Sequence, residues 1–240
     1  MRSNKLFAVN PLSGVFGEAW QLYKAHWLHF FTIAVIVYAL LWVLSVLLTA
    51  ALGTLGAIMA AFIALAGAFW LQGVLIEAVR DVRDGRADLS VRETFAGALP
   101  HFNRIAVAGI LAAIGITFGL LLLIVPGLIL LTIWIMIIPA IVLEDRGVFE
   151  AFGRSRELVR GHGWNVFGVI VLTVLLLIGV SLVISLLLAP LENWVARLVG
   201  DIAGNTVVAP FVVTTWTLAY YRLRAAKEPA EPEPASEFAV

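Results

Sequence analysis

Long stretches without a charged residue alternate along the chain with short segments rich in Arg and Glu. The charge-free stretches span residues 25–76, 105–143, 161–191 and 202–221. A helix crosses the hydrocarbon core of a bilayer with about 20 apolar residues, and in lipid the backbone satisfies its polar groups only as a helix or a closed barrel. The pattern therefore predicts an all-α polytopic membrane protein.

Glycine and proline divide these stretches into six predicted transmembrane helices. The first stretch is long enough for two helices, and the sequence Gly-Thr-Leu-Gly at residues 53–56 favours a tight turn. Pro126-Gly127 favours a reversal in the second stretch, because proline lacks the N–H that a helix interior needs. The expected spans are residues 27–51, 55–79, 104–125, 128–145, 164–189 and 205–223. The fourth is short, so a re-entrant hairpin is an alternative to a full pass.

The basic residues lie almost entirely on one side of this predicted arrangement. Of the 16 Lys and Arg residues, 15 fall at the N-terminus, after the second span, after the fourth span or at the C-terminus, and Arg197 alone falls between the fifth and sixth spans. Cytoplasmic loops retain Lys and Arg, so we expect both termini in the cytoplasm and the protein in a bacterial inner (plasma) membrane. Residues 1–226 form the predicted membrane domain, and the Glu- and Pro-rich residues 227–240 form a predicted disordered tail.

Each predicted hairpin is preceded by a short segment whose apolar residues recur at helical spacing. The stripe residues are Leu12, Val15, Phe16, Ala19 and Tyr23 in the first segment, Val91, Phe95 and Ala98 in the second, and Val148, Phe152, Ser155 and Val159 in the third. The spacing predicts three interfacial amphipathic helices, with a Ser90–Glu93 capping box in the second and a Glu150–Arg154 ion pair in the third. Three parallel repeats of amphipathic helix plus hairpin would explain the pattern, and so would independent anchoring of each helix at the headgroup level.

Composition removes several classes of function. The chain has no cysteine and a net charge of zero, so it offers no thiol chemistry and no bulk attraction to nucleic acid. No phosphate-binding loop, nucleophile elbow or metalloprotease motif occurs in the sequence, and the pair His26 and His29 is too small a donor set for a metal site. We therefore predict no enzyme, no cofactor and no metal.

Few ionisable side chains fall within the predicted spans, where such residues mark ion or proton pathways. Gln72 and Glu77 are the candidate intramembrane polar residues of the second span, and Glu144 ends the fourth. For both glutamates we favour ion pairing at a helix end, Glu77 with Arg80 and Glu144 with Arg146, over a role in transport.

A set of residues in the second half of the chain carries a family resemblance. The set comprises Pro126, Gly127, Pro139, Glu144, Ala151, Arg154, Ser155, Leu158, Gly161 and Trp164, with Thr214-Thr215 and Tyr220-Tyr221-Arg222 near the C-terminus. It resembles the signature of the glycerophosphoryl diester phosphodiesterase membrane-domain family, a group of uncharacterised multi-pass bacterial membrane proteins. Some members join such a region to a phosphodiesterase barrel. The His-Arg-Gly motif of that barrel does not occur in this sequence, so the resemblance implies no enzymatic activity.

The same residues have expected structural roles. Pro126-Gly127 would reverse the chain, Pro139 would bend the fourth span, and the Ser155 hydroxyl would contact either a backbone carbonyl of a neighbouring helix or a lipid headgroup. We expect a non-catalytic protein of structural, assembly or regulatory role in envelope or lipid physiology, whose partners are membrane lipids and other membrane proteins or a second copy. The alternative is a transporter or lipid-handling protein with a site between the hairpins, near Pro139 and Gln72.

Overall fold

The computed structural model describes residues 10–83, 89–188 and 194–228, and for residues 194–205 it describes the course of the helix only. The described elements are α2 (Val15–Ala25), α3 (Trp27–Arg83), α4 (Val91–Ala98), the short 3₁₀ turn η1 (Leu99–His101), α5 (Phe102–Leu122), α6 (Ile124–Trp134), α7 (Ile137–Glu144), α8 (Val148–Val159), α9 (Gly163–Leu188) and α10 (Trp194–Lys227). All of them are helical, so the predicted all-α class is confirmed for this part of the chain.

Four helical stretches among the described residues are long and apolar enough to cross a membrane. They are Trp27–Arg83, Val91–Leu122, Ile124–Glu144 and Gly163–Leu188, and each contains a segment with a mean hydropathy of at least 2.5. These lengths and compositions are compatible with the predicted membrane location.

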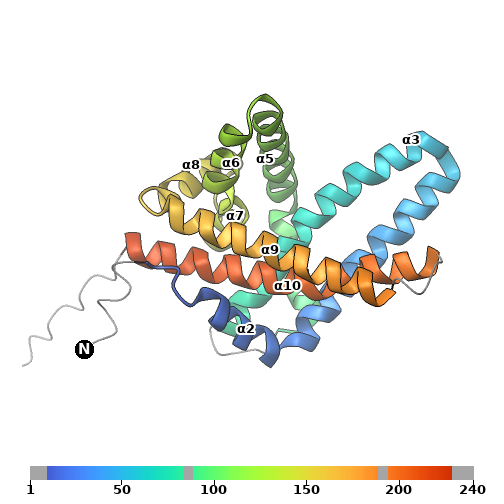
Figure 1. Cartoon of the computed structure of the whole chain (residues 1–240), viewed down its shortest axis with the longest axis horizontal. Helices are drawn as coiled ribbons and strands as arrows, with labels where there is room; N and C mark the ends of the chain where they lie inside the picture. The colour runs from blue at the N-terminus through green and yellow to red at the C-terminus, as the bar shows by residue number, and fades with distance from the viewer. Residues whose placement is uncertain (1–9, 84–88, 189–193, 229–240) are drawn as a thin grey trace, which may run out of the picture.

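The first predicted hairpin lies within α3, which folds back on itself (Figure 1). The backbone leaves the helical region at Gly53, where φ is 57° and ψ is −131°. Glycine adopts a positive φ at little cost because it has no Cβ. A Cβ on Gly56 would lie 1.8 Å from the carbonyl oxygen of Leu48, so the backbones approach closely beside this turn. The turn predicted at residues 53–56 therefore lies where α3 reverses.

The second hairpin reverses earlier than Pro126-Gly127, so the predicted turn position was wrong. The break between α5 and α6 is at Leu123, whose backbone is extended with φ −156° and ψ 135°. Pro126 lies in the first turn of α6, where a helix does not use the backbone N–H that proline lacks. Gly127 instead allows close packing, because a Cβ at this position would lie 2.6 Å from the backbone nitrogen of Leu120 in α5.

The predicted fourth span is divided into α6 and α7 by a break at Ile135 and Met136. Pro139 follows this break in the first turn of α7. In an unbroken helix the carbonyl of Ile135 would accept a hydrogen bond from the N–H of residue 139, which proline does not have. The break therefore falls at the carbonyl that Pro139 frees, as the predicted bend requires.

The three predicted amphipathic helices are present as α2, α4 and α8. At the start of α4, the Ser90 backbone N–H donates to Glu93 Oε2 at 2.8 Å and the Glu93 N–H donates to Ser90 Oγ at 3.3 Å, which confirms the capping box. In α8, Glu150 accepts a hydrogen bond from the Gly147 N–H at 3.2 Å. Arg154 lies on the buried side of α8 with other carboxylates, so the predicted Glu150–Arg154 pair was wrong.

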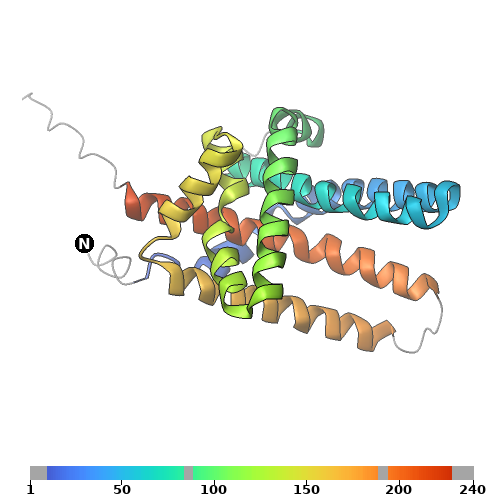
Figure 2. The same ribbon diagram turned by 90° about the horizontal axis from the view of Figure 1, so that it is seen from above.

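The packed core lies at one end of the helical hairpins. Fully buried side chains at this end include Phe30, Ile33, Leu75, Ile141 and Leu158. Figures 1 and 2 show the arms of α3, the α5–α6 hairpin and the α9–α10 pair extending away from this packed base. Large apolar side chains on the arms are exposed, among them Leu55, Phe62, Leu121, Leu182 and Leu187. Apolar surface on this scale is typical of a surface covered by lipid or protein.

The end of α10 completes the packed base. α10 continues to Lys227, and Glu228 forms an ion pair with Arg154 of α8. These two residues, assigned to the tail by the sequence prediction, therefore belong to the ordered part. The rest of the predicted disordered tail, residues 229–240, lies outside the described residues.

Candidate functional site

The predicted signature residues Glu144 and Arg154 form a buried ion pair at the base. Arg154 of α8 donates from Nε to Glu144 Oε2 at 2.9 Å and from Nη2 to Glu144 Oε1 at 3.0 Å, which makes the pair bidentate. Their side chains are 8% and 7% exposed. Arg154 also contacts Glu157 at 3.1 Å and Glu228. We call Arg154, Glu144, Glu157 and Glu228 the Arg154 cluster.

The charges around this cluster balance. Arg146 lies 3.2 Å from Glu144, and Arg224 lies 3.6 Å from Glu144 and 3.2 Å from Glu228. Three arginines thus face three glutamates. Burial of the Arg154 guanidinium opposes its charge, but hydrogen bonds to Glu144, Glu228 and Glu157 outweigh burial and raise its pKa. Together with Arg146 and Arg224 the cluster is neutral, which suits it to joining α7, α8 and α10, and its groups have partners without any ligand.

The Ser155 hydroxyl joins the two sides of the break between α6 and α7. It accepts a hydrogen bond from the Met136 backbone N–H at 3.1 Å and donates one to the Ile133 carbonyl at 2.7 Å. Ser155 is fully buried. Of the two expected contacts, the backbone carbonyl of a neighbouring helix is therefore the one that the structure shows, and the hydroxyl serves backbone groups that the break frees.

Replacing Ser155 with alanine should lower the free energy of unfolding by about 1–3 kcal/mol, because a buried donor and a buried acceptor would lose their partner. The matched control is Thr132→Val in α6. The Thr132 hydroxyl donates to the Leu128 carbonyl of its own helix, which keeps its helical hydrogen bond after the substitution. Thermal unfolding in detergent would compare the two variants, and equal losses would contradict the bridging role of Ser155.

The two predicted intramembrane polar residues do not join the Arg154 cluster. Glu77 is buried in α3 and forms the predicted ion pair with Arg80, at 2.7 Å. A Cβ on Gly97 of α4 would lie 3.0 Å from Glu77 Oε1, so α4 covers this carboxylate closely. Gln72 is half-buried in the same helix. Glu77 therefore supports the packing of α3 against α4 at the base.

Gly161 and Trp164 lie at the junction between α8 and α9. Gly161 has a φ of 87°, a left-handed conformation that favours glycine, and it turns the chain out of α8. Trp164 is 85% exposed in the first turn of α9. An exposed tryptophan where an apolar helix begins is typical of the headgroup level of a membrane.

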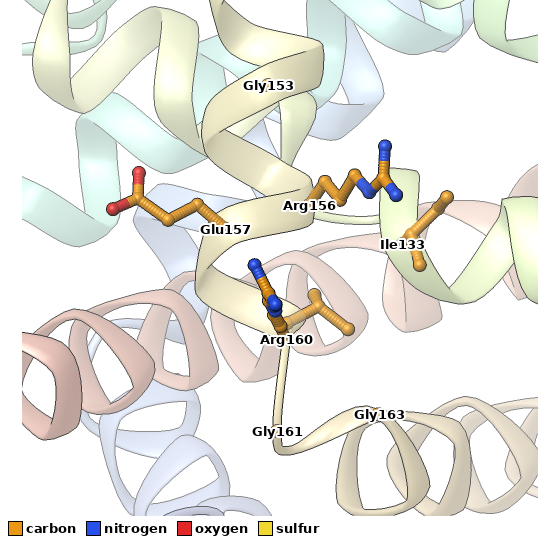
Figure 3. Close-up of a pocket in the computed structure, with 8 residues that line it drawn as sticks. Ile133, Gly153, Arg156, Glu157, Arg160, Gly161 and Gly163 are labelled. Carbon is orange, nitrogen blue, oxygen red and sulfur yellow. The ribbon is translucent and has the colours of Figure 1, made fainter.

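A cavity of about 710 Å³ opens at this junction (Figure 3). Its lining comprises Ile133, Gly153, Arg156, Glu157, Val159, Arg160, Gly161 and Gly163. Figure 3 shows Arg156 extending from α8 towards Ile133, Arg160 at the end of α8 beside the turn at Gly161, and Glu157 pointing to the other side. We call this space the α8–α9 cavity. The sequence analysis missed it because it counted Arg156 and Arg160 only as cytoplasmic charges.

The α8–α9 cavity and, except for Glu228, the Arg154 cluster lie within the region that matches a family model. That model, the domain of unknown function DUF7847, matches residues 86–223, which include α4 to α9 and most of α10. No curated protein and no solved structure matches the chain. Because the matched residues make up more than half of the 240 residues, the chain belongs to the DUF7847 family.

Proposed function

We propose that this chain is a six-pass, non-catalytic protein of a bacterial inner membrane, with a structural, assembly or regulatory role in envelope or lipid physiology. The observation that carries the proposal is the division of the molecule into a packed, ion-paired base and exposed apolar arms. Lipid covers such arms, and the base remains at the membrane surface to contact other molecules.

The lengths of the arms support the proposal of six passes. The two arms of α3 contain about 26 and 30 residues, and at 1.5 Å per residue each exceeds the roughly 30 Å of the hydrocarbon core. α5 and α9 contain 21 and 26 residues. α6 and α7 together would make the fourth pass, and α10, with 34 residues, would make the sixth.

The orientation is supported by the charges at the base. The Arg154 cluster, the Arg104–Asp145 pair and the Arg222–Glu18 pair all belong to it. With 15 of 16 basic residues assigned to the same side, this side is the cytoplasmic one.

A scaffold role is favoured over transport by the packing around Pro139. Ile137, Ala140 and Ile141 beside this proline are buried, and so are Leu71 and Val74 on either side of Gln72 in α3. Apolar side chains thus fill the surroundings in which the alternative places a transport site. The resemblance to the glycerophosphoryl diester phosphodiesterase membrane-domain family remains a second line of support for a role in lipid physiology.

Reporter fusions test the six-pass topology. Fusions after Arg92, after Arg156 and at the C-terminus should report the cytoplasm, whereas fusions near Thr54, Leu123 and Arg197 should report the external side, because the basic segments stay inside. An external signal after Arg156, or a cytoplasmic one near Leu123, would contradict the six-pass topology.

Copurification in mild detergent, followed by protein mass spectrometry, tests the scaffold role. We expect a membrane-protein partner or a second copy at a fixed ratio. The transport alternative makes a different prediction: the purified chain in liposomes would carry a defined solute, and Pro139→Ala would abolish this flux at normal protein abundance. That flux would overturn the scaffold role without affecting the topology.

A further inference from the structure

We propose that the α8–α9 cavity binds a phosphate group, held by Arg156 and Arg160. Both arginines line the cavity and are exposed. Neither side chain forms a hydrogen bond or ion pair with any residue in the described part of the chain. The lipid form of this inference rests on the membrane location in the proposed function.

The positions of the two arginines on α8 favour a shared anion. Gly153, Arg156 and Arg160 are separated by three and four residues, so they occupy one face of the helix. Arg156 and Arg160 are an i,i+4 pair of like charges, which repel each other unless a negative group lies between them. The guanidinium group is planar and presents several N–H donors, which matches the oxygens of a phosphate.

The acidic residue in the cavity lining does not neutralise these arginines. Glu157 accepts a hydrogen bond from Arg154 Nη1 at 3.1 Å and so belongs to the Arg154 cluster. In Figure 3 its carboxylate points away from Arg156 and Arg160. The lining therefore contains two arginines and one glutamate, and because that glutamate is already paired with Arg154, an anion would neutralise the arginines.

Three glycines keep space open beside the arginines. A Cβ placed on Gly153, Gly161 or Gly163 would meet no atom within 4 Å. α9 begins at Gly163, and the first N–H groups of a helix are free to donate and carry partial positive charge. The cavity thus has the room, the charge and the hydrogen-bond donors for a phosphate.

The place of the cavity in the fold selects the sources of that phosphate. It lies between the amphipathic α8 and the apolar α9, next to the exposed Trp164 and within one turn of the buried Val166. In the proposed orientation this is the headgroup level of the cytoplasmic leaflet. A phospholipid headgroup and a soluble cytoplasmic phosphate both reach such a position, and both present the same oxygens.

Binding to the purified full chain in a neutral detergent tests the proposal with three probes. Phosphatidylglycerol carries a phosphate and acyl chains, diacylglycerol carries acyl chains alone, and inorganic phosphate carries no acyl chain. Native mass spectrometry measures bound lipid, and equilibrium dialysis measures bound radiolabelled phosphate. We expect phosphatidylglycerol to bind at least about tenfold more tightly than diacylglycerol, because charge-assisted hydrogen bonds to phosphate are lost in the latter.

The variants separate the cavity from general positive charge. Arg156→Gln/Arg160→Gln should weaken phosphatidylglycerol binding by at least about tenfold, whereas Arg92→Gln should leave it unchanged. Arg92 is a matched control because it is exposed on the amphipathic α4 and has no ion pair or hydrogen bond through its side chain in the described residues. Gly153→Leu should also block binding by filling the cavity. Its control is Gly17→Leu in α2, another exposed glycine with nothing within 4 Å of its Cβ position.

The outcomes decide both the site and the source. Loss of phosphatidylglycerol binding in the double variant and in Gly153→Leu, with no binding of inorganic phosphate, supports a lipid headgroup site. Tight binding of inorganic phosphate that is lost in the same variants supports a site for soluble phosphate. Equal binding of either probe to the double variant and to Arg92→Gln would overturn the proposal, and so would diacylglycerol binding as tight as that of phosphatidylglycerol. None of these readouts depends on the number of passes, so a failure here is distinct from a failure of the topology.

Discussion

Replacing Arg154 with alanine should lower the free energy of unfolding by about 3–5 kcal/mol, the largest loss expected for a single substitution in this chain. The guanidinium is almost fully buried and is the main partner of the equally buried Glu144. Without it, Glu144 retains Arg146 and the more distant Arg224, both about 45% exposed. A buried carboxylate whose bidentate partner is removed has lost most of the interactions that compensated for its desolvation. Thermal unfolding or steric trapping in detergent would measure the loss.

A double substitution separates the unpaired charge from the lost packing. Glu144→Gln/Arg154→Leu removes both charges while it keeps side chains of comparable size. We expect the double variant to be more stable than Arg154→Ala, because no ionised group is then left buried without its partner. If the double variant were the less stable of the two, the unpaired Glu144 carboxylate would not be the main cause of the loss in Arg154→Ala. If Arg154→Ala left the free energy of unfolding unchanged, Arg154 and Glu144 would not form the buried pair described above.

The helices were predictable because the property that defines them is local. A bilayer requires an uninterrupted apolar run, and a reversal requires a residue that tolerates an unusual backbone. In the sequence, residues 25–76 form such a run and Gly53 is such a residue. In the structure, α3 includes most of this run and leaves the helical conformation at Gly53. The second reversal shows the limit of such rules. Pro126 is compatible with a turn and equally with the first turn of a helix, and the structure adopts the latter, with the break at Leu123.

The buried face of α8 was predictable only in part. Ala151, Arg154, Ser155 and Leu158 recur at helical spacing and were recognised through the family resemblance, but the predicted stripe comprised Val148, Phe152, Ser155 and Val159. In the structure, Val159 is buried together with the recurring residues, and Val148 and Phe152 are half-buried. A charged residue such as Arg154 is buried only when it has partners, and those partners lie 10 and 74 residues away at Glu144 and Glu228. Periodicity within one helix carries no information about contacts at such separations.

The α8–α9 cavity depends on a similar non-local arrangement. The spacing of Gly153, Arg156 and Arg160 is visible in the sequence, and it could have drawn attention to a basic helix face with a missing side chain. The opposite wall is formed by Ile133 of α6 and by the turn at Gly161. That wall is placed by the Ser155 bridge and by the positive φ of Gly161, neither of which follows from the spacing on α8.

The close packing of the α5–α6 hairpin predicts a second large effect. Gly127→Val should lower the free energy of unfolding by about 3 kcal/mol, at the upper end of the range for overpacking. A Cβ on Gly127 would lie 2.4 Å from Leu120 Cγ and 2.6 Å from the Leu120 backbone nitrogen, and a Cβ on Gly119 would lie 3.0 Å from the Cα of Gly127. A change of rotamer could move the Leu120 side chain away, but the backbone of α5 can move only if the hairpin opens.

The control for this substitution is Gly179→Val in α9. Gly179 also lies within an apolar helix, is exposed and has nothing within 4 Å of its Cβ position. Glycine and valine differ by less than about 0.5 kcal/mol in helix propensity, so we expect the control to keep the stability and the yield of the parent protein. Gly127→Ala should fall between the two, because it adds the clashing Cβ but none of the atoms beyond it. Equal stability of the Gly127→Val and Gly179→Val variants would show that α5 and α6 do not approach each other at Gly119 and Gly127, and the reversal at Leu123 would then have to be abandoned.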